Sequence, residues 1–179
     1  MTIGDFTIRP ARRRDAADLL ALNAANVPEV GTMDDAKLSA FLERAPLFLV
    51  VELAATGAAA DESEVVGMLI CLTERSTFYQ SPNYRWFAER HECFAYVDRI
   101  ALAPAARGTG CGPALYRRAV AFTEATGRPV LCAEVNTEPD NPRSHRFHQR
   151  FGFVDVGRAR PYGPDEEVAM YEFTPRARP

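Results

Sequence analysis

The sequence of 179 residues has no excess of positive charge. Its net charge is −3, whereas proteins that bind nucleic acid usually carry a basic excess or a concentrated basic stripe. The run of arginines at 12–14 is too short for such a stripe, and it is diluted by Asp15 and Asp18. We therefore expect no nucleic acid among the partners of this chain.

Closely spaced cysteines are also missing. The four cysteines, Cys71, Cys93, Cys111 and Cys132, contain no Cys-x-x-Cys spacing, so neither a zinc site nor a disulfide framework is indicated. Cys71 and Cys132 lie in apolar runs, where cysteine behaves as a small hydrophobic residue.

No apolar run approaches the roughly 18 residues of a membrane-spanning helix. The first 15 residues lack the apolar core of a signal peptide, so we expect a cytoplasmic location and no membrane partner. Internal repeats, low-complexity tracts and linkers are absent as well. With 47% hydrophobic and 25% charged residues, the composition is typical of a globular protein. We expect one domain over residues 1–179, with 174–179 as a frayed tail.

Helix and strand patterns alternate through the middle of the chain, while its front carries a predicted hairpin and its back two successive strands. A surface loop at 54–63 is expected to join the hairpin strands, and the aromatic stretch 75–92 is expected to be a long loop or a broken helix. This mixture indicates an α/β or α+β fold, in which helices pack on a sheet. Strands are predicted at 6–11, 47–53, 64–74, 93–103, 129–136, 151–160 and 166–173, and helices at 14–27, 32–45, 110–126 and 141–150.

Three glycines stand on alternate positions, 108, 110 and 112, between a predicted strand and a predicted helix. The N-terminus of a helix presents unpaired backbone N–H groups and a positive dipole end, which together attract anions. Glycines let the backbone close on such an anion, and Arg107 adds a full charge. Pro113 falls in the first helical turn, where its missing N–H is tolerated.

Two phosphate loops of other classes do not fit this stretch. A Walker loop ends in Gly-Lys-Ser/Thr, but Pro113 follows Gly112. A dinucleotide fingerprint needs Gly-x-Gly-x-x-Gly in a βαβ unit, whereas the third glycine here comes one residue early. A glycine-rich helix start without a ligand stays open as the structural alternative.

The segment IALAPAARGTGCGPAL resembles the coenzyme A loop of the GNAT superfamily of N-acyltransferases, whose pattern is Arg/Gln-x-x-Gly-x-Gly/Ala after a strand. Arg107, Gly110 and Gly112 match that pattern. Downstream, NPRSHRFHQRFGF resembles a second family motif, Asn-x-x-Ala/Ser-x-x-aliphatic/aromatic-Tyr-x-x-x-Gly-Phe. It is matched at Asn141, Ser144, Phe147, Gly152 and Phe153.

The resemblance implies a mixed, mostly antiparallel sheet of six to seven strands with helices on both faces and splayed central strands, here 94–102 and 130–135. It also implies an enzyme that transfers an acetyl group from acetyl-CoA, without a metal. Backbone groups of the fourth strand would pair with the pantetheine arm, and the glycine loop would hold the diphosphate. The implied cofactor-binding residues are Ile100, Ala101, Leu102, Arg107, Gly108, Thr109, Gly110, Cys111, Gly112, Asn141, Ser144 and Phe147.

One position departs from the family pattern. The residue four before Gly152 is usually Tyr, which protonates the leaving thiolate, and here it is His148. An imidazole can act as a general acid at neutral pH. A single His on an apolar helical stripe is also typical of a buried core residue, so both interpretations of His148 stay open.

Acyl transfer to an amine needs a base, because an alkylammonium has a pKa of about 10.4. Asp98 and Glu134 each interrupt an apolar strand near the expected splay, and a charge there is costly unless it is paired or used. Asp98 could instead pair with an arginine such as Arg99, and Glu134 could reach solvent at a strand end. Of the two, we favour Glu134 as the base.

The acceptor is expected to be a small primary amine, attacked in a ternary complex. The alternatives are a protein N-terminal or lysine acetyltransferase, or an acyl-CoA-binding module without activity. A homodimer is compatible with the sequence. Candidate wall residues of the acceptor pocket, each of which could equally be ordinary packing, are Asn23, Asn26, Tyr79, Tyr84, Trp86 and Tyr162.

Overall fold

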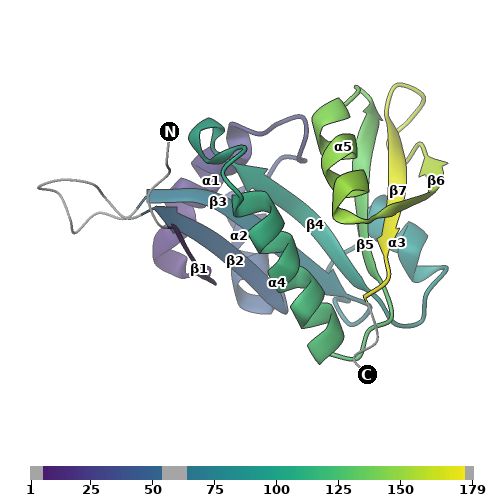
Figure 1. Cartoon of the computed structure of the whole chain (residues 1–179), viewed down its shortest axis with the longest axis horizontal. Helices are drawn as coiled ribbons and strands as arrows, with labels where there is room; N and C mark the ends of the chain where they lie inside the picture. Colours follow the sequence, from purple (N-terminus) through teal and green to yellow (C-terminus); the bar gives the residue numbers. More distant parts are fainter. Residues whose placement is uncertain (1–5, 54–63, 176–179) are drawn as a thin grey trace, which may run out of the picture. The chain divides into compact units, whose positions relative to one another are not determined.

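The structure is a computed structural model that describes residues 6–53 and 64–175 (Figure 1). Seven strands form a sheet with the order β1-β2-β3-β4-β5-β7-β6. β4 and β5 are parallel, whereas the pairs β1–β2, β5–β7 and β6–β7 are antiparallel. This mixed, mostly antiparallel sheet confirms the predicted fold class. The predicted loop at 54–63 lies outside the described residues, as do the last four residues of the predicted tail.

The chain divides into two compact units, and three elements run from one unit into the other. The first unit contains the chain up to Ile70 together with Arg99–Arg118, and the second contains Cys71–Asp98 together with the chain from Ala119 onward. The single domain expected for residues 1–179 stays a prediction.

In the first unit, local signals set the ends of the elements. The Asp34 side chain accepts a hydrogen bond from the Lys37 amide at 2.7 Å and so caps the second helix, which buries Leu38 and Phe41. Arg9 is paired with the buried Asp15 at 2.7 Å, which ties the first strand to the turn that follows it. The elements are β1 (Phe6–Pro10), a 3-10 turn (Arg13–Asp15), α1 (Ala16–Ala24), α2 (Asp35–Arg44), β2 (Leu47–Leu53) and β3 (Glu64–Thr73), which ends in the second unit.

The remaining elements include one helix in a stretch that the sequence predicts to be a long loop or a broken helix. It lies inside the stretch 75–92, where Ser81 caps it by accepting the Tyr84 amide at 3.1 Å and Pro82 takes its first position. These elements are α3 (Pro82–Ala88), β4 (Ala95–Leu102), a 3-10 turn (Pro104–Ala106), α4 (Cys111–Ala125), β5 (Leu131–Glu138), α5 (Pro142–Phe151), β6 (Val154–Ala159) and β7 (Glu167–Phe173).

Helices α3 and α5 lie on opposite faces of the β5–β7 pair in the second unit (Figure 1). Side chains alternate between the faces of a strand, so Ala133 and Tyr171 share one face and Glu134 shares the other with Met170. His145 of α5 contacts the Tyr171 hydroxyl at 2.9 Å, whereas Asn83 of α3 donates to Glu134. The face toward α3 is therefore the one that carries the acidic side chain of β5.

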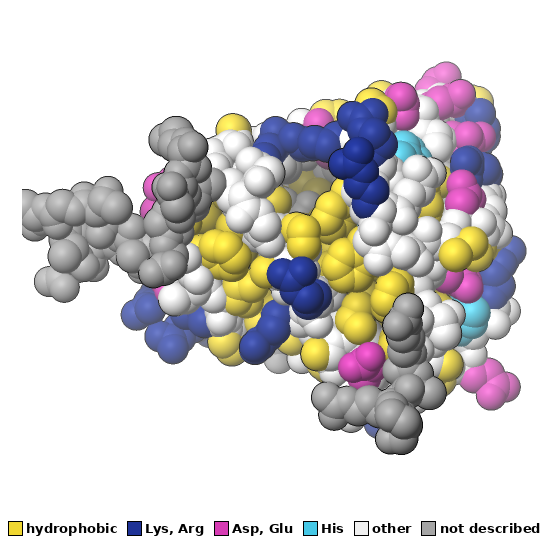
Figure 2. Space-filling model, in the orientation of Figure 1, with side chains coloured by type: hydrophobic (Ala, Val, Ile, Leu, Met, Phe, Trp, Pro, Cys, Tyr) yellow, Lys and Arg dark blue, Asp and Glu magenta, His cyan; other side chains and the backbone are white. Residues whose placement is uncertain are grey.

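Basic side chains on the face seen in Figure 2 lie in separate groups among hydrophobic ones rather than in one continuous stripe. Arg117 and Arg118, on α4, are among the exposed arginines. Within residues 6–53 and 64–175, no helix combines the length and the apolar character that a membrane crossing requires.

Candidate functional site

The glycine loop leads from β4 into the first turn of α4, as the sequence predicts. Gly108 and Gly110 have φ angles of +79° and +94°, a region that residues with a side chain rarely adopt. A Cβ at either position would meet nothing within 4 Å, so these glycines are required by the backbone and not by lack of space. Gly112 lies inside α4 without a positive φ. The first amides of α4 have no partner inside the helix, which is the arrangement that binds anions.

Arg107 holds this loop in place. Its Nε donates to the Leu102 carbonyl at 3.2 Å, and its Nη2 donates to Asn26 Oδ1 at 3.0 Å. The Thr109 hydroxyl donates to the Ala106 carbonyl at 2.7 Å and so closes the turn. The guanidinium thus links the loop to the end of β4 and to the turn after α1, and its contact with a diphosphate stays a prediction.

Two predicted wall residues of the acceptor pocket are buried in this first unit. Asn26, 7% exposed, accepts from Arg107, and Asn23, 1% exposed, accepts from the buried Arg99 at 2.6 Å. The same Arg99 nitrogen donates to the Gly31 carbonyl at 3.0 Å. Both asparagines therefore anchor arginines, which accounts for their burial without a substrate.

The β4–β5 ladder ends early. Its register runs from Ala95 and Leu131 to Val97 and Ala133, although β4 and β5 continue to Leu102 and Glu138. The next residues on the two strands are Asp98 and Glu134, the two candidate bases. Ile100, Ala101 and Leu102 follow on β4, and their pairing with pantetheine stays a prediction.

Glu134 has a buried carboxylate with an asymmetric set of partners. Its Oε1 accepts from the Tyr96 hydroxyl at 2.9 Å and from Asn83 Nδ2 at 3.2 Å. Its buried Oε2 and the buried Oδ1 of Asn83 have no hydrogen-bond donor within the described part of the chain. Burial raises the pKa of Glu134 to about 8, the charge of Asp98 adds to this rise, and the donors Tyr96 and Asn83 oppose it.

Asp98 is held by an aromatic side chain. The Tyr79 hydroxyl donates a hydrogen bond to Asp98 Oδ1, and burial together with the Asp98 charge raises the pKa of Tyr79. Tyr162 is 58% exposed, and its partial burial with the charges of Glu134 and Asp98 raises its pKa as well. Two of the predicted wall residues, Tyr79 and Tyr162, therefore interact electrostatically with both candidate carboxylates.

The other two predicted wall residues pack within the second unit. The Tyr84 hydroxyl donates to the Thr73 carbonyl at 2.7 Å, and Tyr84 is 5% exposed. The guanidinium of Arg90 lies 3.5 Å from the centre of the Trp86 ring, which also lies against Gly157. These contacts agree with ordinary packing, and a role of either residue in the acceptor pocket stays a prediction.

Asn83 and Tyr96 are the site residues that sequence reasoning missed. Tyr96 is read as one more apolar residue of a strand, and Asn83 lies in an aperiodic stretch. The pair Ser81-Pro82, a helix cap followed by proline, is the signal that could have placed Asn83 on a helix.

Helix α5 has the predicted ends, since Asn141 caps it by accepting the Ser144 amide at 3.1 Å and Gly152 takes a left-handed φ of +110°. His148 is 2% exposed and stacks on Tyr171, and Phe147 packs edge-on against it. His148 Nδ1 lies 2.8 Å from the Ser144 carbonyl oxygen, so Nδ1 carries the proton and donates it.

Burial lowers the pKa of His148 to about 4, so the ring is neutral at pH 7. A neutral ring whose proton is bonded to a backbone carbonyl favours the second interpretation, a core residue. Roles of Asn141, Ser144 and Phe147 toward the cofactor stay predictions.

Three solved acetyltransferases have a similar fold. Arabidopsis thaliana NAA60 in complex with acetyl-CoA has a TM-score of 0.76 at 12% identity, over 95% of this chain and 99% of that one. An N-acetyltransferase from Staphylococcus aureus Mu50 has a TM-score of 0.67 at 21% identity, over 97% of this chain and 100% of that one. The ribosomal-protein-S18-alanine N-acetyltransferase from Escherichia coli has a TM-score of 0.68 at 14% identity, over 98% of this chain and 97% of that one. At these identities the likeness establishes the fold. The search of curated proteins found no match.

The sequence itself also matches a family model. The model is described as the acetyltransferase (GNAT) family, and it matches residues 18–153. This stretch contains the glycine loop, both carboxylates and the second motif, and it covers most of the chain. The match confirms the resemblance that the two motifs indicate, together with the enzyme class, an acyl-CoA-dependent N-acetyltransferase. The chain therefore belongs to the GNAT family of acetyltransferases.

Proposed function

We propose that this enzyme transfers the acetyl group of acetyl-CoA to a primary amine, and that Glu134 takes the proton from the amine before attack. The observation that carries the proposal is the half-satisfied carboxylate of Glu134, whose Oε1 is held by Tyr96 and Asn83 while the buried Oε2 has no donor within residues 6–53 and 64–175. A buried acceptor atom without a donor is costly, which marks the place where a substrate donor would bind.

An ammonium group suits this place. It brings three N–H donors and a positive charge. The site offers two buried acceptors, Glu134 Oε2 and Asn83 Oδ1, on side chains that are hydrogen-bonded to each other. Asp98 adds a second negative charge close enough to shift the pKa of Glu134. The site therefore attracts a cation and offers it a base.

The chemistry divides among the residues as follows. Glu134 accepts one proton from the ammonium, and the neutral amine attacks the thioester carbonyl carbon. As the C–S bond breaks, the thiolate takes up a proton and the new amide nitrogen loses its second one. The amides at the start of α4 support binding of the donor through its diphosphate. His148 as donor of the thiolate proton stays a prediction.

A small molecule with a primary amine is the first candidate acceptor. A protein α-amine is the second candidate, and it is favoured by the match between its pKa and the raised pKa of Glu134. With the pKa of Glu134 raised to about 8, proton transfer from a peptide α-ammonium, pKa about 7.7–8.0, is nearly balanced, whereas an alkylammonium of about 10.4 gives up its proton less readily. The similar structures include the NatC complex bound to a Gag peptide and CoA.

Release of free CoA thiol tests the proposal. The protein is mixed with acetyl-CoA and a panel of small amines and peptides with free α-amines, and thiol is measured with time. Turnover of small amines supports the first candidate, and preference for peptides supports the second. No release with any acceptor, despite measurable binding of acetyl-CoA, would overturn the proposal in favour of a binding module.

Glu134→Gln tests the base directly. Loss of a general base lowers kcat by about 10²–10⁴-fold, and we expect the Kd of acetyl-CoA to stay the same because the loop amides are untouched. Glu138→Gln is the matched control, because Glu138 is exposed at the end of the same strand. A Glu134→Gln enzyme with wild-type kcat would contradict the assignment.

A further inference from the structure

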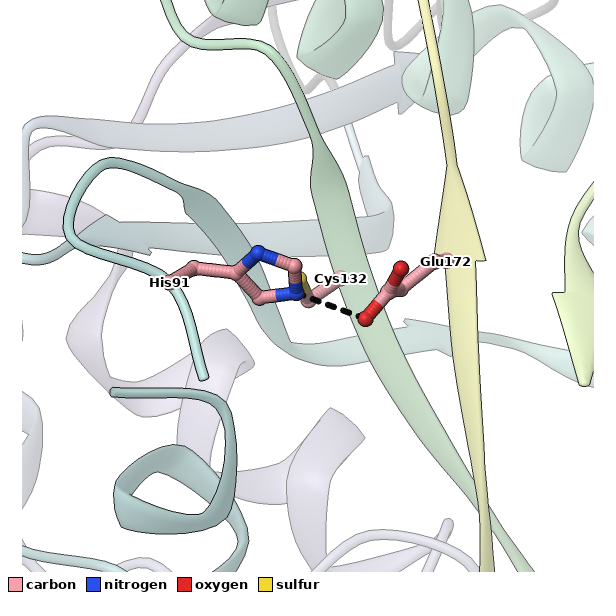
Figure 3. Close-up of side chains that lie close together, drawn as sticks. All are labelled: His91, Cys132 and Glu172. Atoms are coloured by element: carbon pink, nitrogen blue, oxygen red, sulfur yellow. Dashed lines mark hydrogen bonds and ion pairs between the residues drawn. The ribbon is translucent and has the colours of Figure 1, made fainter. Parts of the chain in front are cut away.

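Three side chains of ligand type converge in the second unit, apart from the carboxylate pair described above (Figure 3). Cys132 on β5 and Glu172 on β7 are direct partners in the antiparallel register, so their side chains share one face of the sheet. His91 comes from the segment between α3 and β4. The His91 nitrogen, the Cys132 sulfur and a Glu172 carboxylate oxygen all lie within 4.8 Å of one another.

The three ligand atoms would reach a tetrahedral arrangement through side-chain shifts of different size. Zinc bonds of about 2.0–2.3 Å to nitrogen, oxygen and sulfur place neighbouring ligand atoms roughly 3.3–3.6 Å apart. His91 Nε2 and Glu172 Oε1 are 2.7 Å apart, a hydrogen-bond distance, so these two atoms need to separate by only about half an ångström to hold a cation. From the outer limit of 4.8 Å, the Cys132 sulfur and the other two atoms would have to approach by about 1.2 Å. Rotation about the side-chain bonds of His91 and Glu172, which are partly exposed, can supply such a shift.

The three side chains differ in their exposure to solvent. Cys132 is fully buried, while the side chains of His91 and Glu172 are 26% and 23% exposed. The His91 amide donates to the Phe87 carbonyl at 2.9 Å, which fixes the segment that carries the imidazole. A cation can therefore enter between His91 and Glu172 and meet the sulfur below them.

We propose that His91, Cys132 and Glu172 bind one divalent cation of the zinc type, with a water molecule as the fourth ligand. On binding, the S–H bond of Cys132 breaks and its proton goes to solvent. The cation takes the place of the Nε2 hydrogen that donates to Glu172, and that proton moves to Nδ1, so the imidazole releases no proton to solvent. Of the six waters of the hydrated ion, one stays as the fourth ligand and five are lost, and the net release is one proton per cation.

The donor set defines the metal class. A thiolate and an imidazole favour Zn²⁺ and Co²⁺ over Mg²⁺ and Ca²⁺, which prefer six or more oxygen ligands. Zn²⁺ is expected to bind more tightly than Co²⁺ because Zn²⁺ has no d-electron preference for another geometry and takes a four-coordinate tetrahedral site readily.

Co²⁺ is the probe for the test. Chelator-treated, metal-free protein is titrated with CoCl₂, and the near-ultraviolet absorption of a cobalt–thiolate bond is recorded. We expect one equivalent to bind with this band and Zn²⁺ to displace it, while MgCl₂ leaves it unchanged. Calorimetry with ZnCl₂ in two buffers of different ionisation enthalpy should give release of one proton per ion.

Variants identify the ligands. Cys132→Ser should abolish the thiolate band. His91→Asn should weaken Co²⁺ binding by more than about tenfold, because loss of a residue that only contacts a metal ligand already costs about that much affinity. Cys93→Ser is the control, because Cys93 is a partly exposed thiol close to His91 in the chain. If Cys132→Ser fails to fold, His91→Asn decides alone, since His91 lies in a partly exposed segment. Absence of the band in the wild type, its survival in Cys132→Ser, its loss in Cys93→Ser or unchanged affinity of His91→Asn would each overturn the proposal.

Discussion

Glu134 is subject to opposing influences on its proton affinity. Burial and the neighbouring Asp98 charge disfavour the carboxylate, and the donors Tyr96 and Asn83 stabilise it. The balance raises the pKa of Glu134 to about 8, so the base is only partly ionised at neutral pH. Its activity should therefore depend on pH in a way that each neighbour controls separately.

Two single-residue variants should move the pH profile in opposite directions. The rate needs ionised Glu134, so kcat/KM should rise with pH through about 8 in the wild type. Asp98→Asn removes a repelling charge and should shift the rise to lower pH. Tyr96→Phe removes a donor to the carboxylate and should shift it to higher pH. The profiles are measured with one acceptor and with chelator present, so that titration of the amine and bound metal are the same throughout. Shifts in the same direction would contradict the assignment.

His148 affects stability through its protonation. The pKa of His148 is lowered to about 4 in the fold from 6.5, so the unfolded chain binds a proton more readily between these values. The stability that this neutral ring contributes is complete above pH 6.5 and is lost as pH falls toward 4. The loss is on the order of 3 kcal/mol over that range.

We expect His148→Phe to flatten the pH dependence of the free energy of unfolding between pH 7 and pH 4.5, as measured by urea titration. The comparison uses the change with pH within each protein, so a constant packing penalty cancels. If His148 is a core residue, kcat of the variant stays near that of the wild type. A large fall in kcat with unchanged acetyl-CoA affinity would return it to the role of acid.

At the scale of elements, the glycine loop depends on backbone conformation at two positions. Gly110→Ala would place a side chain at φ +94°, which costs roughly 1–2 kcal/mol. We expect the loop to relieve this strain by moving, so the Kd of acetyl-CoA should rise by about tenfold, the equivalent of 1.4 kcal/mol. The change in kcat at saturating acetyl-CoA should be small.

Gly31→Ala is the control for this prediction. Gly31 belongs to the same compact unit, has no positive φ, and a Cβ there would meet nothing within 4 Å. Calorimetric titration of both variants with acetyl-CoA measures the difference. Equal affinities would show that the loop conformation does not govern binding.

Elements whose ends are marked by neighbouring residues are predictable from the sequence. Asn141 and Gly152 bound α5 as expected, because a cap and a left-handed glycine act within a few residues. The partners of Glu134 are not predictable in this way, since Asn83 and Tyr96 lie 51 and 38 residues away in the chain. Asn23 and Asn26 are misleading for the same reason: their hydrogen-bond partners Arg99 and Arg107 come from distant segments.

At the scale of the whole molecule, the single domain expected from the sequence makes a calorimetric prediction. One domain should unfold in one transition, although the chain divides into two compact units. Acetyl-CoA at a hundredfold excess over its Kd adds about 2.7 kcal/mol to the free energy of unfolding, which raises Tm by roughly 5–10 °C for a chain of this size.

Differential scanning calorimetry with and without acetyl-CoA checks this. Two resolved transitions, only one of which moves with acetyl-CoA, would contradict the single domain. CoA without the acetyl group serves as the comparison, because the loop amides are expected to hold the diphosphate that both molecules share.

The unmatched oxygens of Glu134 and Asn83 have a consequence for selectivity. An analogue of the true acceptor with a methyl group in place of the amine would have the same shape, yet it would seal both oxygens away from water without giving them a hydrogen. Sites that leave polar atoms stranded in this way reject such mimics far more strongly than sites that differ by one methylene. Discrimination against isosteres would thus come from two buried oxygens of the enzyme that lack hydrogen-bond donors, and it would act at binding, before the acetyl transfer begins.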